Sequence, residues 1–138
     1  MVDISEALIN VLSADSRIEE LVGDKIYPMI LPEDCSLPAI VYTPIYCDYD
    51  SALGGDTGYV KQTVQIVCHD RTYKRARKLS RIVKDIIQDR HGDMGGLYIE
   101  AVFIKTDTII SGNTSLKFNT EEYMSSIEFD FYFNEKEE

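Results

Sequence analysis

The segment of residues 121–133 constrains the fold more than any other part of the chain. On one side of it, nearly every second side chain is large and apolar, whereas most of the intervening positions are polar or charged. This alternation predicts a β-strand with one buried face. Such a strand needs partners in a sheet and a layer of structure over its apolar side. The apolar positions are Tyr123, Ile127, Phe129, Phe131 and Phe133.

Two segments have the period of a helix. Residues 3–12 place an apolar stripe behind the candidate N-cap Asp3, and a capping-box pattern at residues 16–19 begins a short second turn that ends at Gly23. A long central helix is predicted from Asp70 or Thr72 to about Arg90. Its apolar stripe consists of Tyr73, Ala76, Leu79, Val83, Ile86 and Ile87.

The remaining strands are predicted from their β-branched and aromatic residues. Residues 25–31 indicate a short edge strand, since Pro28 cannot donate to a ladder. Residues 39–49, which Pro44 interrupts, and residues 59–68 indicate an antiparallel hairpin. A further strand is expected at residues 97–106, with Leu97, Ile99, Ala101 and Phe103 on one face.

Two connections have the composition of loops. Residues 50–58 contain three glycines and two aspartates, and residues 107–120 are polar and rich in turn-forming residues. We expect the first to be a long loop and the second a loop or splayed hairpin tip. With little to bury, both should be mobile in the isolated chain and ordered by a partner.

These elements predict a single α+β domain over residues 1–138. Its sheet has about four strands, mainly antiparallel, and an N-terminal helix and one long central helix pack on one face. The length of 138 residues suits one domain. The charged tail, residues 134–138, is expected to be frayed.

Charge is distributed unevenly along the chain. The net charge is −10, which argues against general affinity for nucleic acid. Residues 71–90 alone carry +6, so the rest of the chain carries −16. A basic element on an acidic body can attract copies of the same chain or an acidic neighbour. No apolar run reaches the roughly 20 residues of a membrane span, and no secretory signal is expected.

The sequence predicts no catalytic, cofactor or metal site. Three widely spaced cysteines favour neither zinc nor a disulfide framework. Cys68 and His69 are adjacent in a predicted strand, so they should point to opposite faces rather than form a nucleophile pair. The acidic pairs Asp48/Asp50 and Glu121/Glu122 lack a series of further ligands. We therefore expect a protein that is not an enzyme.

Candidate interaction residues come from the basic helix and the glycine-rich loop. The outer face of the helix can be a solvated surface, a protein interface or a DNA contact, and the sequence leaves these alternatives open. The candidates for a protein interface are Lys74, Arg75, Lys78 and Arg81 on the helix, with Asp50, Gly54, Gly55 and Asp56 in the loop.

The order of these features resembles a known family. The opening helix is followed by Leu-Val-Gly-Asp-Lys-Ile-Tyr-Pro at residues 21–28 and Leu-Pro-Ala-Ile-Val-Tyr at residues 37–42. After the glycine-rich loop come Val-Gln-Ile-Val-Cys at residues 64–68 and a helix that opens with Asp-Arg-Thr-Tyr at residues 70–73. Together these stretches, within residues 5–90, are similar to the tail completion proteins of long-tailed phages, also called tail terminator or tail-to-head joining proteins. The basic helix is not a signature of that family.

The resemblance implies a structural role without catalytic residues. Proteins of that family form a ring, typically of six copies, on the head-proximal end of the tail tube, where the ring halts polymerisation and meets the head connector or stopper. Assembly in the cytoplasm of a bacterial host and a final place at the head–tail junction of the virion are then expected, with genome DNA only passing through the ring. Two alternatives are another neck or tube component, and a nucleic-acid-binding module that uses the helix of residues 71–90.

Overall fold

A five-stranded sheet forms the body of the protein in the computed structural model, which describes residues 3–115 and 120–135. The strand order is β1-β2-β3-β7-β6, with β1 parallel to β2 and all other neighbours antiparallel. The main sheet is therefore mixed, with one more strand than the approximate count expected. The strands are β1 (Ile26–Pro28), β2 (Ala39–Ala52), β3 (Gly55–Asp70), β6 (Ala101–Ser115) and β7 (Thr120–Asn134).

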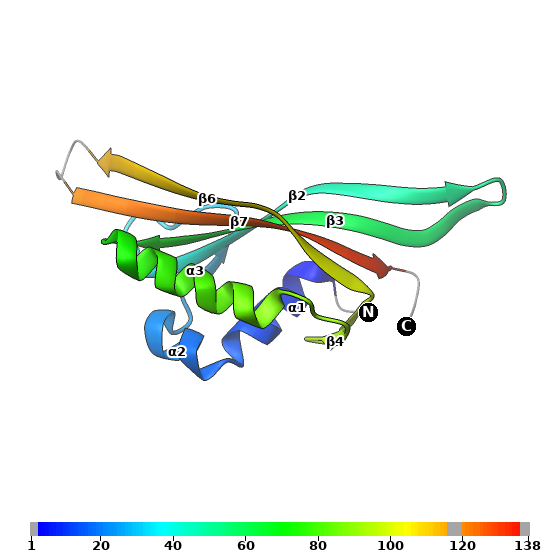
Figure 1. Cartoon of the computed structure of the whole chain (residues 1–138), viewed down its shortest axis with the longest axis horizontal. Coiled ribbons are helices and arrows are strands. Elements are labelled where there is room, and N and C mark those ends of the chain that lie inside the picture. Colours follow the sequence, from blue (N-terminus) through cyan, green and yellow to red (C-terminus); the bar gives the residue numbers. More distant parts are fainter. Residues whose placement is uncertain (1–2, 116–119, 136–138) are drawn as a thin grey trace.

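The helices lie together on one face of this sheet, as Figure 1 shows. They are α1 (Ile4–Ser13), α2 (Ser16–Val22) and α3 (Tyr73–Ile87), and a small hairpin of β4 (Gly92–Met94) and β5 (Leu97–Ile99) lies beside α1. The predicted α+β class is confirmed, with helices packed on one face. None of the helices described here is long and apolar enough to cross a membrane.

The helix starts follow from their capping residues. The Asp3 carboxylate accepts a hydrogen bond from the Glu6 amide at 2.9 Å. The Thr72 hydroxyl accepts one from the Arg75 amide at 3.3 Å, so Thr72 rather than Asp70 caps α3. Each cap satisfies an amide that has no partner inside the helix.

The core lies between the helices and the apolar side of the sheet. The predicted alternation of β7 is confirmed, because Ile127, Phe129, Phe131 and Phe133 are all buried. Their neighbours on β3 and the inner stripe of α3 belong to the same cluster, which also includes residues of α1, α2, β2, β6 and the β4–β5 hairpin. The main contributors from these two elements are Val60, Val64, Ile66, Cys68, Leu79, Val83 and Ile87.

The long loop predicted at residues 50–58 is wrong. Strands β2 and β3 continue to pair up to Ala52 and Gly55, which leaves only Leu53 and Gly54 in the turn. Glycine and aspartate are rare in strands because they have little to pack, but backbone pairing between two adjacent chain segments does not require packing. We call residues 48–59 the arm; in Figure 1 it extends beyond the layer of helices at one end of the molecule.

The second predicted loop, residues 107–120, is also mostly strand. β6 continues to Ser115 and β7 begins at Thr120, with paired residues along most of both strands. Residues 116–119, the rest of that predicted loop, lie outside the described residues. In the predicted frayed tail, Asn134 pairs with Tyr59 and the Glu135 amide donates to the Gly58 carbonyl at 2.8 Å, so these two residues extend the sheet. Residues 136–138 lie outside the described part.

The single strand predicted at residues 97–106 is divided at Glu100. β5 pairs with β4 outside the main sheet, and β6 joins β7 only from Ala101 onward. The bend shifts the alternation by one residue, so Val102 is buried and Phe103 is 60% exposed. The prediction that Phe103 shares a buried face with Leu97 is therefore wrong.

Pro44 lies inside β2 at a register shift, which confirms the predicted interruption of this strand.

Candidate interaction surfaces

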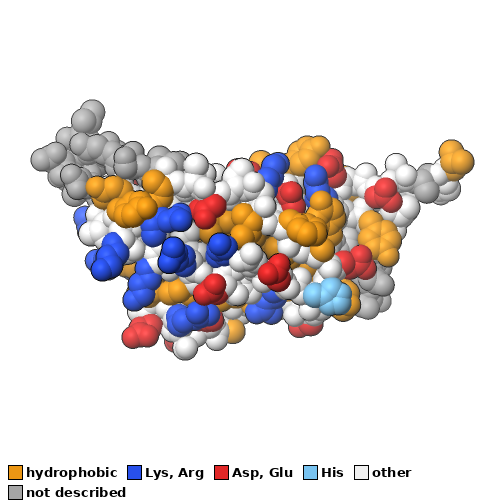
Figure 2. Space-filling view, viewed as in Figure 1, with side chains coloured by type: hydrophobic (Ala, Val, Ile, Leu, Met, Phe, Trp, Pro, Cys, Tyr) orange, Lys and Arg blue, Asp and Glu red, His pale blue; other side chains and the backbone are white. Residues whose placement is uncertain are grey.

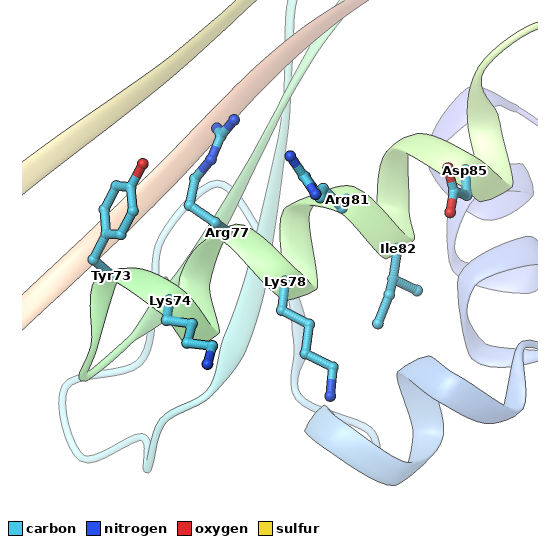
Figure 3. A pocket seen from close by; sticks show the side chains of 7 residues that line it. All are labelled: Tyr73, Lys74, Arg77, Lys78, Arg81, Ile82 and Asp85. Carbon is cyan, nitrogen blue, oxygen red and sulfur yellow. The ribbon is translucent and has the colours of Figure 1, made fainter.

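The outer face of α3 carries an open groove of about 680 Å³. Figure 3 shows two rows of side chains that point to different sides of the helix, Tyr73, Arg77 and Arg81 in one row and Lys74, Lys78 and Ile82 in the other. Each row has a spacing of four residues, which aligns side chains into ridges along a helix. Asp85 also lines the groove, near the end of the helix. The helix therefore buries one apolar stripe in the core and presents a ridged basic face outward.

Much of the positive charge in this groove is not neutralised by the residues that the structure describes. Arg77 is the exception, since its guanidinium lies 2.9 Å from the Asp107 carboxylate. Among the described residues, no carboxylate oxygen lies within 4.0 Å of the charged groups of Lys74, Lys78 or Arg81. These three side chains are exposed and available to an acidic group from outside.

Arg75, the fourth predicted residue of this set, lies elsewhere. Its guanidinium faces the buried carboxylate of Asp70 at 3.4 Å, and it does not line the groove. The structure thus brings together Lys74, Lys78 and Arg81, and separates Arg75 from them. Tyr73 and Ile82 add apolar surface to the groove, and Tyr73 was predicted to lie on the core stripe but is exposed.

The arm is the second candidate surface. The predicted residues Asp50, Gly54, Gly55 and Asp56 all lie in it, at or near the turn. Asp50 accepts a hydrogen bond from the Thr57 hydroxyl at 2.8 Å, which ties the two strands together. Asp48 accepts one from the Tyr46 hydroxyl at 2.7 Å, and this contact raises the pKa of Tyr46.

Sequence reasoning missed the apolar residues of the arm. Leu53 is fully exposed at the turn, and Tyr49 and Tyr59 are also exposed. One signal could have identified them. It was a leucine beside two glycines, in a segment that offers nothing to bury it against. Exposed apolar side chains on a protruding acidic hairpin indicate a contact surface.

The groove and the arm lie in different halves of the molecule. The tip of the β2–β3 hairpin is at one end of the long axis in Figure 1. The Lys and Arg side chains gather over α3 on the other half of the molecule in Figure 2. The arm of one chain therefore does not meet the groove of that same chain.

Cys68 and His69, the pair considered above as a possible nucleophile and base, point to opposite faces of the sheet. Cys68 points into the core, where burial raises its pKa, and His69 lies on the helix-free face. The predicted opposite orientation is confirmed. The His69 Nδ1 atom lies 2.5 Å from the Glu122 carboxylate, so its ring is held by the sheet. Within the described ranges, no cluster of three or more candidate ligands could hold a metal ion.

Comparison with known proteins agrees with this architecture. The fold is similar to that of a chain from the virion of a native gene transfer agent (GTA) particle, with a TM-score of 0.74 and 14% sequence identity over 95% of this chain and 94% of the other. No curated protein sequence matches. Residues 6–118 match the family model described as tail completion protein gp17. Because the match spans most of the sequence, the chain belongs to this family of phage tail completion proteins.

Proposed function

We propose that copies of this chain form a ring, hexameric on assembly, on the head-proximal end of a phage tail tube. The ring ends polymerisation of the tube protein and offers its other side to the head connector or stopper. Assembly takes place in the cytoplasm of the bacterial host, and the ring stays at the head–tail junction of the virion. The observation that carries this proposal is membership of the tail completion family, which makes the chain a structural phage tail protein.

The geometry of the chain supports ring formation. A closed ring is built from heterologous contacts, in which two different surfaces of each subunit meet. An acidic arm at one end of the molecule and a basic groove over α3 in the other half are two such surfaces. A self-complementary patch, by contrast, would favour a two-fold dimer.

The charge of the chain suits a channel for DNA. A net charge of −10 disfavours general binding to phosphates, so a genome can pass through the lumen without being retained. No specific nucleic acid is a partner in this proposal.

Tube growth tests the function directly. The cognate tube protein is polymerised with and without this chain, and tube lengths are measured by negative-stain electron microscopy. We expect shorter tubes with a ring at one end, in proportion to the amount of chain added. Incorporation along the tube would identify a tube subunit instead. Absence of the chain from tube ends, with binding to an isolated connector, would identify a neck component.

The groove on α3 supports one alternative, a nucleic-acid contact. Three of its cations have no acidic partner in the described part of the chain and could bind phosphates. Retention on a DNA column that falls steeply between 50 and 200 mM salt would favour this alternative. Our proposal predicts no such retention at physiological salt.

A further inference from the structure

We propose that the arm of one copy docks into the α3 groove of the next copy around the ring. This inference rests on the proposed function only in taking the partner to be a second copy of the same chain. The occupant of the groove is then the tip of a β-hairpin, residues 48–59, and each subunit uses one arm and one groove.

Charge complementarity supports this pairing. The arm contains three aspartates and neither lysine nor arginine, and the Asp48 carboxylate at its base is paired with Lys61 at 3.7 Å. The groove presents Lys74, Lys78 and Arg81 without acidic partners among the residues that the structure describes. Opposite potentials on two surfaces steer them together and disfavour contacts between like surfaces.

Apolar surface is matched as well. Leu53 is fully exposed at the tip of the arm, and Tyr73 and the small exposed edge of Ile82 line the groove at the ends of its two rows of side chains. Contact between these side chains removes apolar surface from water, which is favourable in proportion to its area. A groove of about 680 Å³ is within the range of clefts that enclose a small ligand, so it is large enough for the few side chains of a hairpin tip.

The position of the two surfaces makes the contact intermolecular. Because the arm projects from one end of the long axis and the groove lies over α3 in the other half of the molecule, an arm reaches only the groove of another copy. Repeating this contact gives a head-to-tail chain of subunits, which closes into a ring when the rotation per subunit divides a full turn.

Two variants, each with a matched control, separate the halves of the contact. Leu53→Asp alters the arm, and Ile30→Asp changes an equally apolar exposed residue outside it. The double variant Lys78→Glu/Arg81→Glu alters the groove, and Lys105→Glu reverses an exposed lysine on β6. All five substitutions in these four variants replace exposed residues, so thermal unfolding followed by circular dichroism should match the wild type.

Mixing the variants gives the sharpest result. The arm variant keeps an intact groove, and the groove variant keeps an intact arm, so the mixture has a single functional contact. We expect each variant alone to self-associate at least about tenfold more weakly than wild type, since desolvated contacts at the centre of an interface dominate binding. We expect the mixture to form a one-to-one dimer and no larger species in sedimentation velocity. The control variants should assemble as wild type does.

Three results would overturn the inference. One is ring formation by either variant at wild-type concentration, which refutes the contact and leaves the proposed function intact. The second is a mixture that stays monomeric under conditions in which the wild type associates. The third is loss of DNA retention in the groove variant with unchanged assembly, which assigns the groove to nucleic acid. A mixed dimer from chains whose wild type does not end tube growth would instead refute the function and support the contact.

Discussion

Phe129 and Phe103 are on adjacent strands but in opposite environments. Phe129 is fully buried between the sheet and the helices, whereas Phe103 is 60% exposed and contacts the Tyr132 ring edge to face, with centroids 5.7 Å apart. We expect Phe129→Ala to lower the free energy of unfolding by about 3–5 kcal/mol, because it leaves a cavity in the core. Phe103→Ala should cost less than about 1.5 kcal/mol, the upper range for an exposed aromatic pair.

Chemical denaturation of both variants measures this difference. The two substitutions remove the same atoms and each ends one aromatic contact, so most of the difference between them reports burial. Equal losses would show that residue 103 is packed in solution, and thus that the bend at Glu100 is absent.

Gly95 lies where the β4–β5 hairpin meets α1. Its φ of +59° is in the left-handed region, and an added Cβ would collide with the Ala7 carbonyl oxygen and lie 2.9 Å from the Asn10 Cβ. The Gly95 carbonyl also accepts a hydrogen bond from the Asn10 side chain at 2.8 Å. We expect Gly95→Ala to destabilise the fold by about 1–3 kcal/mol, through strain and the displaced contact.

Gly54→Ala is the matched control for that substitution. Gly54 is at the tip of the arm, and a Cβ there would meet nothing within 4 Å of the described structure. Gly54→Ala should change the free energy of unfolding by no more than about 0.5 kcal/mol. A similar loss in both variants would count against the packing of the small hairpin on α1.

Single residues show where sequence reasoning succeeds. The alternation in β7 and the stripes of α1 and α3 predict burial well, because a period of two or 3.6 follows from the local backbone. The exposure of Phe103 could not be predicted in the same way. It depends on the bend at Glu100 that moves the chain from one sheet to another, and a bend of one residue reverses every later side chain.

At the scale of elements, the arm is a part of the sheet that the helices do not support. Its backbone is paired on β2 and β3, but no helix covers it and several of its side chains are exposed. Regions with few buried contacts open locally at low free energy. We therefore expect the amides of residues 48–59 to exchange with solvent far faster than those of residues 63–68, which lie in the helix-covered part of β3.

Hydrogen exchange of the isolated chain, followed by mass spectrometry, measures this contrast. The same arm amides should become protected once the protein is assembled, because a partner then covers them. Protection of residues 48–59 in the dilute chain, equal to that of residues 63–68, would mean that the arm already packs on its own domain.

The arm also marks the limit of element prediction. Residues 50–58 have the composition of a loop, and composition reports what an element can bury rather than how its backbone pairs. The backbone pairing of β2 with β3 and of β6 with β7 therefore extends beyond the residues that these strands contribute to the core. The candidate interaction residues of the arm were predicted to lie in a loop and lie instead at the paired end of β2 and β3, and the apolar residues Leu53 and Tyr49 were missed for the same reason.

At the scale of the whole molecule, the two long hairpins and the one-sided helical layer give the chain distinct ends. In Figure 1 the β2–β3 hairpin extends toward one end, and the described parts of β6 and β7 run toward the other. An elongated subunit with different surfaces at its two ends suits repeated head-to-tail contact. Since the chain belongs to the family of tail completion proteins, we propose that this contact is made at the end of a phage tail.

The mass of the assembled protein tests this account most directly. The full chain is measured by mass photometry and sedimentation velocity over a wide range of concentration, with electron microscopy of the largest species. We expect monomers when dilute and, as concentration rises, one limiting species with six times the 15.7-kDa mass of the chain and the outline of a closed ring. High salt should weaken its formation, since the Debye length falls from about 10 Å at 0.1 M to about 3 Å at 1 M. A stable compact dimer, or a mass that grows without limit, would contradict the account.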